Sequence, residues 1–134
     1  MYIPPGFSTI TPYFMVKDAL AFVDFLVSAF GGTEELRSLR PDGRISNTQI
    51  CIGTSTIMVS EASDRYPPMA AAFYLYVEDA DTAMAQAIAS GATLEMRVDD
   101  MPYGDRQGGS ERCTWKHLVD FPAIGTRAIL CVNG

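Results

Sequence analysis

Apolar and polar residues alternate along the first half of the chain in a pattern that predicts one strand, one helix and then three strands. A period of two in residues 7–16 predicts the first strand, and apolar residues three and four apart in residues 19–30 predict the helix. Asp18 precedes the helix and is a good N-cap, because its carboxylate can accept a hydrogen bond from a free amide of the first turn. The later strands are predicted at residues 33–40, 44–52 and 56–60. The predicted element order is therefore βαβββ.

Glycine and proline residues mark the ends of these elements. Gly31 and Gly32 end the helix, since glycine adopts the left-handed backbone conformation without strain. Pro41-Asp42-Gly43 predicts a tight turn, because proline presets φ and glycine accepts a positive φ. In the strand after this turn, a period of two places the odd-numbered residues from Ile45 to Cys51 on one face.

The same pattern returns in the second half of the chain. The segment V-K-D-A that begins at Val16 returns as V-E-D-A at Val77, each followed by a helical pattern, a glycine and a threonine. Asp79 is the expected N-cap of the second helix, and Gly91 is its expected end. A repeat of about 60 residues is too long for a solenoid unit and indicates a duplicated supersecondary module.

The repeat predicts one α+β domain over residues 1–134, made of two tandem βαβββ modules at about 7–61 and 71–134. The end of the second module is harder to assign. Residues 101–109 are typical of a glycine-rich loop or hairpin arm, and residues 110–134 contain one strand-like segment near 126–132.

The composition indicates a folded domain and argues against several classes of partner. Of the 134 residues, 48% are hydrophobic, so the chain can bury a core. The net charge of −6 argues against nucleic-acid and anionic-membrane partners, which attract basic surfaces. Cys51, Cys113 and Cys131 are odd in number and widely spaced, which fits reduced thiols. With no signal-peptide pattern and no apolar run of ~18–20 residues, a cytoplasmic protein is expected.

Aromatic residues on the predicted strands are the main candidates for ligand binding. Flat rings stack on planar ligands and their polar tips fix the orientation, although the same rings could simply pack in the core. Alternation places Phe73 and Leu75 on one side of their strand and Tyr74 and Tyr76 on the other. With polar groups from neighbouring strands, the candidate ligand-binding residues are Tyr13, Asn47, Gln49, Glu61, Tyr74, Tyr76, Tyr103 and Trp115.

Two other motifs could carry chemistry but have simpler explanations. His117 is the only histidine, and a lone histidine in a strand is more often structural than catalytic. The segment Gly104-Asp105-Arg106 with Gly108-Gly109 could hold a phosphate, but it lacks the Gly-Lys-Ser/Thr of a P-loop. A turn in which Asp105 and Arg106 pair with neighbours is the preferred explanation.

Several short segments, in their order and spacing, resemble one superfamily. These segments are Tyr2-Ile3-Pro4, Thr11-Pro12-Tyr13, Val16-Lys17-Asp18-Ala19, Ala29-Phe30-Gly31-Gly32, Pro41-Asp42-Gly43-Arg44-Ile45, Leu75-Tyr76-Val77-Glu78-Asp79 and Tyr103-Gly104-Asp105-Arg106-Gln107-Gly108-Gly109. With the paired modules, they resemble the vicinal oxygen chelate superfamily, and within it the PhnB-like and glyoxalase/bleomycin-resistance-like bacterial proteins. The resemblance covers residues 1–109. It implies that each module curls its mixed sheet into a half-barrel, that the halves enclose a cleft, and that the protein is a homodimer.

The resemblance also implies where a metal would be held. Metal-dependent members place one ligand on the first strand and one on the last strand of each module. Carried over, the first-strand positions fall near Thr11 and Ala72, neither of which supplies an imidazole or a carboxylate. Glu61 at the end of the fourth strand is the only matching candidate, and the fourth position is not assigned. We therefore expect no metal and no other cofactor.

Three functions remain open at this point. The leading hypothesis is a protein that binds or sequesters a small molecule in the inter-module cleft without a metal. The alternative is a metal-dependent lyase, isomerase or dioxygenase of the same superfamily. The third is a structural dimerisation module with no ligand.

Overall fold

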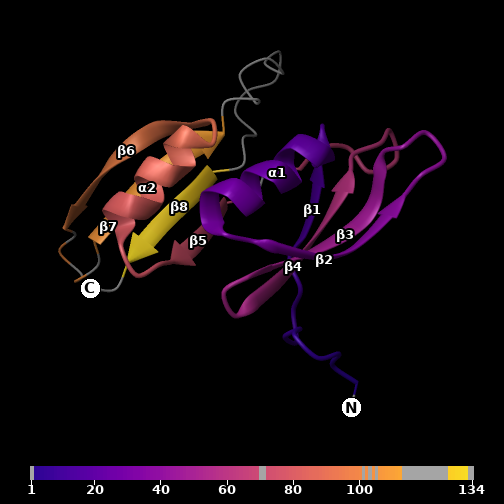
Figure 1. Cartoon of the computed structure of the whole chain (residues 1–134), viewed down its shortest axis with the longest axis horizontal. Coiled ribbons are helices and arrows are strands. Elements are labelled where there is room, and N and C mark those ends of the chain that lie inside the picture. The colour runs from indigo at the N-terminus through magenta and orange to yellow at the C-terminus, as the bar shows by residue number, and fades with distance from the viewer. Residues whose placement is uncertain are drawn as a thin grey trace. The chain divides into compact units, whose positions relative to one another are not determined.

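The computed structural model describes residues 2–69, 72–100, 102, 104, 106–112 and 127–132. The chain divides into two compact units, Met1–Met69 and Ala70–Gly134, and each contains one helix beside a four-stranded sheet (Figure 1). Among the described residues, no helix is long and apolar enough to cross a membrane.

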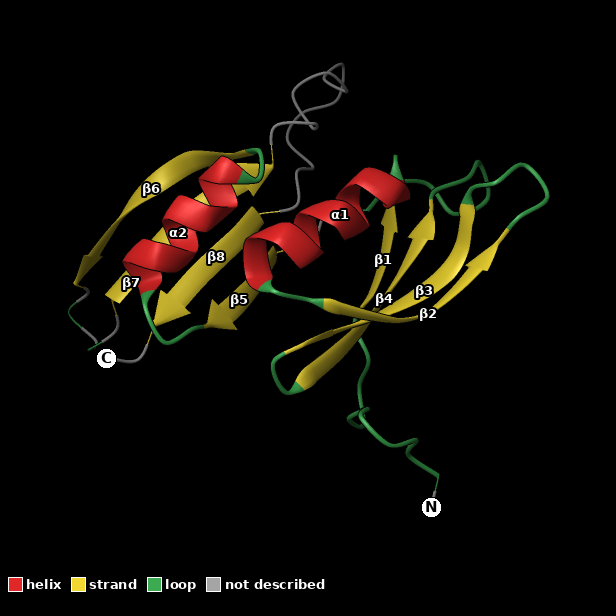
Figure 2. Ribbon diagram, in the orientation of Figure 1, coloured by secondary structure: helices red, strands yellow, loops and turns green. Residues whose placement is uncertain are grey.

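The first unit has the predicted βαβββ order. Its elements are β1 (Tyr13–Val16), α1 (Ala19–Phe30), β2 (Thr33–Leu39), β3 (Ile45–Ile52) and β4 (Ser55–Glu61). The sheet order is β1-β4-β3-β2, in which β1 is parallel to β4 and the other pairs are antiparallel (Figure 2). The first strand is shorter than the predicted 7–16. Three prolines, which lack the backbone N–H needed for strand pairing, lie in the chain before it, and two of them are adjacent, Pro4-Pro5.

The second unit repeats this topology. Its elements are β5 (Ala72–Tyr76), α2 (Ala80–Ala89), β6 (Ala92–Asp100), β7 (Arg106–Arg112) and β8 (Arg127–Val132). The order β5-β8-β7-β6, with β5 parallel to β8, matches the first sheet strand for strand. The α+β fold with two βαβββ modules is therefore confirmed. Of the two alternatives predicted for residues 101–109, a glycine-rich loop or a hairpin arm, the hairpin arm describes the part from Arg106, where β7 begins and pairs antiparallel with β6.

The predicted caps form in both helices. Asp18 accepts a hydrogen bond from the Ala21 amide at 3.3 Å, and Asp79 accepts one from the Thr82 amide at 3.1 Å. Asp18 has a left-handed backbone with φ of 58°, whereas Asp79 is extended. Gly31 ends α1 in the left-handed conformation, as predicted.

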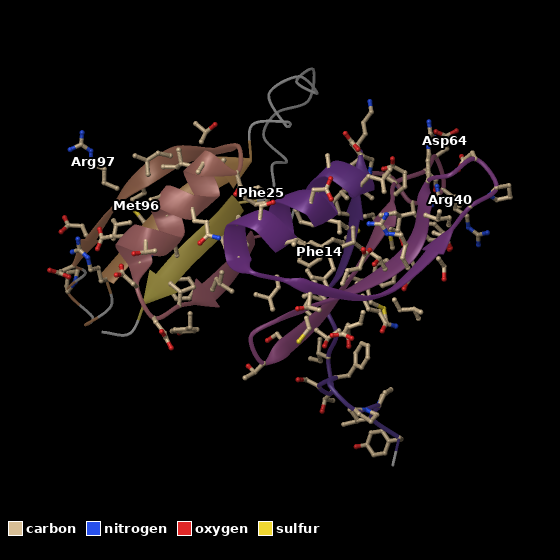
Figure 3. The ribbon with its side chains drawn as sticks, viewed as in Figure 1. Phe14, Phe25, Arg40, Asp64, Met96 and Arg97 are labelled. Carbon is tan, nitrogen blue, oxygen red and sulfur yellow. The ribbon has the colours of Figure 1, made fainter. Side chains whose placement is uncertain are left out.

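Large side chains fill the core of the first unit. Phe22, Val23 and Leu26 of α1 are buried, and the ring of Phe22 packs 6.0 Å from that of Phe14 on β1 (Figure 3). Thr48 and Ile50 of β3 are buried on the same face of the sheet. The simple alternation predicted for β3 fails at Ile45, which is also buried. Between the pairs Ser38–Asn47 and Leu39–Ile45, β3 moves by two residues and β2 by only one. The extra residue on β3 forms a bulge, which turns Ile45 to the buried face.

The buried residues of α2 are on average smaller than those of α1. Ala80, Met84 and Ala87 of α2 are buried, whereas Ile88 is 43% exposed. Gly108 on β7 gives the helix room, since a Cβ there would lie 2.7 Å from Val98 Cγ2 and 3.0 Å from Met84 Cε.

An ion-pair cluster ties β7 to α2 at the surface. Arg106 donates two hydrogen bonds to Asp81, at 2.9 and 3.1 Å, and one to Asp100 at 3.2 Å. These hydrogen bonds lower the pKa of the Asp81 carboxyl and raise that of the Arg106 guanidinium.

Candidate ligand-binding site

One face of the first sheet packs against α1, and the opposite face, called here the distal face, carries the candidate residues. Residues paired in register lie on the same face of a sheet, so the strand pairing assigns them. Tyr13 pairs with Met58, Met58 with Gln49, and Gln49 with Leu36, forming one row across all four strands. The distal face as a whole comprises Tyr13, Met15, Thr33, Leu36, Ser38, Asn47, Gln49, Cys51, Thr56, Met58 and Ser60.

A directed hydrogen-bond network runs across this face. The Ser60 hydroxyl donates its single proton to the Ser46 carbonyl at 2.6 Å. The contact between Ser60 and Tyr13 must therefore use the phenol proton, and Tyr13 is the donor. Asn47 in turn donates through Nδ2 to the Tyr13 oxygen at 3.0 Å. Because the phenol proton is committed to Ser60, the amide nitrogen of Asn47, and not its oxygen, must face Tyr13.

The network leaves acceptors directed away from it. The Tyr13 oxygen, having used its proton and one lone pair, keeps one further acceptor position. Asn47 Oδ1 and the Gln49 amide have no hydrogen-bond partner within the described part of the chain. Hydrogen bonds hold Tyr13 and Asn47 in place, and because Tyr13 is 41% exposed and Asn47 and Gln49 are half-buried, all three side chains are still partly accessible.

The charged side chains at register-paired positions of the same strands lie on the α1 face instead. Glu34 accepts hydrogen bonds from Arg37 at 2.8 Å and from Thr48 at 2.6 Å. Partial burial works to raise the pKa of the Glu34 carboxyl, but these two hydrogen bonds and the Arg37 charge outweigh it, and the pKa is lowered.

Glu61, the candidate metal ligand, has a structural role at the start of α1. Its Oε2 accepts the Ala19 amide at 3.2 Å, and its carbonyl accepts Arg40 Nη2 at 2.7 Å. Arg40 is labelled in Figure 3, near the end of β4. Glu61 pairs with Val16, which is fully buried, and thus lies on the α1 face, apart from Tyr13 and Asn47.

The second unit contains an equivalent tyrosine–amide pair. Tyr74 pairs with Ile129 and Ile129 with Gly109, as Tyr13 pairs with Met58 and Met58 with Gln49. Tyr74 is thus the counterpart of Tyr13, and its hydroxyl donates to Gln107 Oε1 at 2.9 Å. Tyr76 stands beside it, with the two ring centroids 5.4 Å apart in an edge-on arrangement.

The structure thus brings some of the predicted residues together and separates others. Tyr13, Asn47 and Gln49 share one face, and Tyr74 and Tyr76 share the corresponding strand of the second unit. Tyr103, Trp115 and His117 lie outside the described residues.

Sequence reasoning missed Ser60 and Gln107. A signal for Gln107 existed, because 33 positions separate it from Tyr74 and 34 separate Asn47 from Tyr13. Ser60 had no such signal, since it joins Tyr13 only through the parallel pairing of β1 with β4.

The described residues do not suit a metal. No group of three or more histidine, cysteine, aspartate or glutamate side chains gathers among them. The oxygen of Glu61 that would serve as a ligand already binds the first amide of α1. A catalytic zinc takes three protein ligands and a calcium ion takes several oxygens, so this set is insufficient.

Comparison with known proteins identifies relatives of this sequence and of its fold. No protein-family model matches the chain. An uncharacterised protein of Mycobacterium bovis is 29% identical over 113 residues, which span 74% of this chain and 72% of that protein. A Mycobacterium tuberculosis protein matches equally over 65% of its length, so this chain corresponds to just under two-thirds of that protein.

Solved structures match almost the whole chain at low sequence identity. TioX from Micromonospora sp. ML1 superposes with a TM-score of 0.74 and 21% identity, covering 95% of this chain and 99% of TioX. TnmS3, an antibiotic binding protein from Streptomyces sp. CB03234, gives a TM-score of 0.65 and 17% identity over 95% and 98% of the two chains. A glyoxalase/bleomycin resistance protein/dioxygenase family enzyme from Burkholderia phytofirmans PsJN gives 0.66 and 18% over 91% and 95%.

Proposed function

We propose that this chain, which has the fold of the glyoxalase/bleomycin resistance proteins of the vicinal oxygen chelate superfamily, binds a small molecule without a metal. The observation that carries the proposal is the oriented Tyr13–Asn47–Ser60 network on the distal face. A network that holds polar groups in fixed directions beside apolar side chains is typical of a ligand site. The Tyr74–Gln107 pair at the equivalent place suggests that the second unit contributes in the same way.

The chemistry of the residues favours binding over metal-assisted catalysis. Metal-dependent members of the superfamily hold the metal with side-chain ligands, whereas Glu61, the only matching candidate here, is engaged at the start of α1. Among the structural neighbours, TnmS3 is described as an antibiotic binding protein, which supports a sequestering role for a protein of this fold. We further propose that the two modules act as one domain, that their sheets enclose the ligand in a cleft, and that the protein works as a homodimer.

A ligand screen with matched variants tests this proposal. We expect planar, glycosidic or peptide-like antibiotics to include a compound that raises the Tm of the wild-type protein. Tyr13→Phe and Asn47→Ala should lower the affinity for that compound by about 3- to 30-fold each, because each removes one hydrogen bond. Glu61→Gln should change the affinity little. Binding that requires stoichiometric divalent metal and is lost in Glu61→Gln would favour the enzyme alternative, and the absence of any Tm shift would favour a structural role.

A further inference from the structure

The register-paired positions of the distal face carry no charged side chain, although 19% of the residues of the chain are charged. The protein carries 26 acidic and basic residues among its 134, in the proportion 16 to 10. None falls among the register-paired residues of the distal face. Those that fall on the paired positions of the same sheet, Glu34, Arg37 and Glu61, are all on the α1 face.

This distribution reverses the usual one. A sheet that packs a helix on one face and meets water on the other normally places its charged residues on the face toward water. Here the distal face instead combines Met15, Met58 and Leu36 with hydroxyls and amides, and Leu36 is 57% exposed. An uncharged surface of thioether, aromatic and amide groups makes favourable contacts with a neutral molecule. It provides no opposite charge to offset the desolvation of an ionic ligand.

The direction of the hydrogen bonds adds a second requirement. The Tyr13 phenol gives its proton to Ser60 and receives one from Asn47, so it can only accept from a ligand. The Oδ1 of Asn47 is likewise an acceptor. A ligand with an N–H or O–H group would satisfy these atoms, whereas a ligand with acceptors alone would leave them unpaired.

We propose that the distal face of the first unit selects an electrically neutral, aromatic ligand that donates a hydrogen bond to Tyr13 and Asn47. This inference rests on the proposed function and specifies its ligand class. It excludes anionic ligands such as phosphates and carboxylates at this face, because burying an unpaired charge costs more than the contacts return. It also disfavours cationic ligands at this face, since none of its register-paired residues is a carboxylate that could pair with them.

Three matched probes test charge and hydrogen-bond donation separately. N-phenyl-1-naphthylamine is neutral and has an N–H donor, 1-anilinonaphthalene-8-sulfonate adds a negative charge, and 1-phenoxynaphthalene replaces the N–H by an ether oxygen. We expect the neutral amine to bind at least about tenfold more tightly than the sulfonate. We expect it to bind about 3- to 10-fold more tightly than the ether, measured by fluorescence titration and by competition.

Variants place the selection at the distal face. In Tyr13→Phe the preference for the amine over the ether should fall, because one of the two acceptors is gone. Gln49→Lys should raise the affinity for the sulfonate and weaken that for the amine, while Gln86→Lys on the exposed surface of α2 makes the same change and should alter neither. Circular dichroism checks that each variant folds. If Gln49→Lys does not fold, the comparison of the three probes on the wild-type protein still tests the inference.

The outcomes separate this inference from the proposed function. Tight binding of all three probes without preference, or a preference unchanged in Tyr13→Phe and Gln49→Lys, would overturn the selection and leave a small-molecule binder. If no probe binds and no antibiotic raises the Tm, both proposals fail. If Gln49→Lys converts a dimer to a monomer without affecting probe binding, the distal face is covered by a second copy of the chain and the inference is wrong.

Discussion

The two units share one topology, but their helices present buried side chains of different size to the sheets. At the buried position of β3 the first unit has Thr48, and the counterpart on β7 is Gly108, because Gln49 and Gly109 occupy the same place in the register. The first unit fills its interior with large side chains from α1, whereas the second brings an alanine-rich α2 close to a glycine. A fold can therefore persist after duplication while side-chain volume is redistributed between the helix and the sheet, provided that the total side-chain volume still fills the core.

Both units retain a register shift in their second strand and a tyrosine–amide pair between their first and third strands. β2 and β6 each carry a register shift at the same place, between Glu34 and Leu36 and between Leu94 and Met96. The tyrosine of the first strand and the amide of the third also remain, as Tyr13–Asn47 and Tyr74–Gln107. Packing against the helix was thus free to change, whereas the bulge and the tyrosine–amide pair were kept.

The largest effect is expected from removing volume in the first unit. Leu26→Ala deletes a fully buried side chain of α1 and should lower the free energy of unfolding by about 2–5 kcal/mol. Urea denaturation followed by circular dichroism measures the change. Val27→Ala, at a neighbouring position that is 41% exposed, is the control and should cost much less. Equal losses for the two variants would contradict the assignment of the α1 core face.

Adding volume at the corresponding place of the second unit should also destabilise it. Gly108→Thr gives β7 the residue of β3, and its Cβ would be too close to Val98 and Met84. We expect a loss of about 1–3 kcal/mol from overpacking. The double variant Gly108→Thr with Met84→Ala should recover part of that loss in the same urea experiment. No recovery would show that the volumes of helix and sheet do not compensate.

The two N-caps should respond differently to glycine. Asp18 has a φ of 58°, where alanine is strained by about 1–2 kcal/mol and glycine is not. Asp18→Gly should therefore be more stable than Asp18→Ala by about that amount. At the extended Asp79, glycine should be better than alanine by less, since glycine is itself only a fair N-cap. Thermal and urea unfolding of the four variants gives the two differences, which should be unequal.

Ser110 occupies the position of Ile50 and is expected to tolerate loss of its hydroxyl. Its Oγ is buried and has no hydrogen-bond partner among the described residues, whereas the side chain of Ile50 has no polar atom that needs a partner. Ser110→Ala should leave stability unchanged or raise it by up to about 1 kcal/mol, because an unsatisfied buried polar group is removed. A clear loss in urea denaturation would mean that the hydroxyl has a partner outside the described residues.

The smallest effect concerns acid stability. The pKa of Glu34 is lowered in the folded protein, so its stabilising contribution is present above the unfolded-state pKa of about 4.3 and is lost as the pH falls through the folded-state value. Since the pair is partly exposed, we expect only a few tenths of a kcal/mol. Arg37→Gln should reduce the difference in stability between pH 7 and pH 3 by this amount. An unchanged difference would assign acid sensitivity to other carboxylates.

The sequence alone determined the local and repeated features of this protein. Residues 19–30 and the caps Asp18 and Asp79 follow from interactions within one turn of helix, and the duplication is visible in the recurrence of Val16-Lys17-Asp18-Ala19 at Val77. The tyrosines and Asn47 could be proposed as site residues because alternation in a strand is a local property.

Only the tertiary structure decided which of these residues act together. Ser60 joins Tyr13 through a parallel pairing between strands that are distant in sequence, and no local pattern specifies that register. Glu61 had a suitable side chain at a suitable place in the chain, yet the pairing with Val16 turns it to the face where α1 begins. The face on which a strand residue lies depends on every bulge and partner before it, and these are set by packing across the whole sheet.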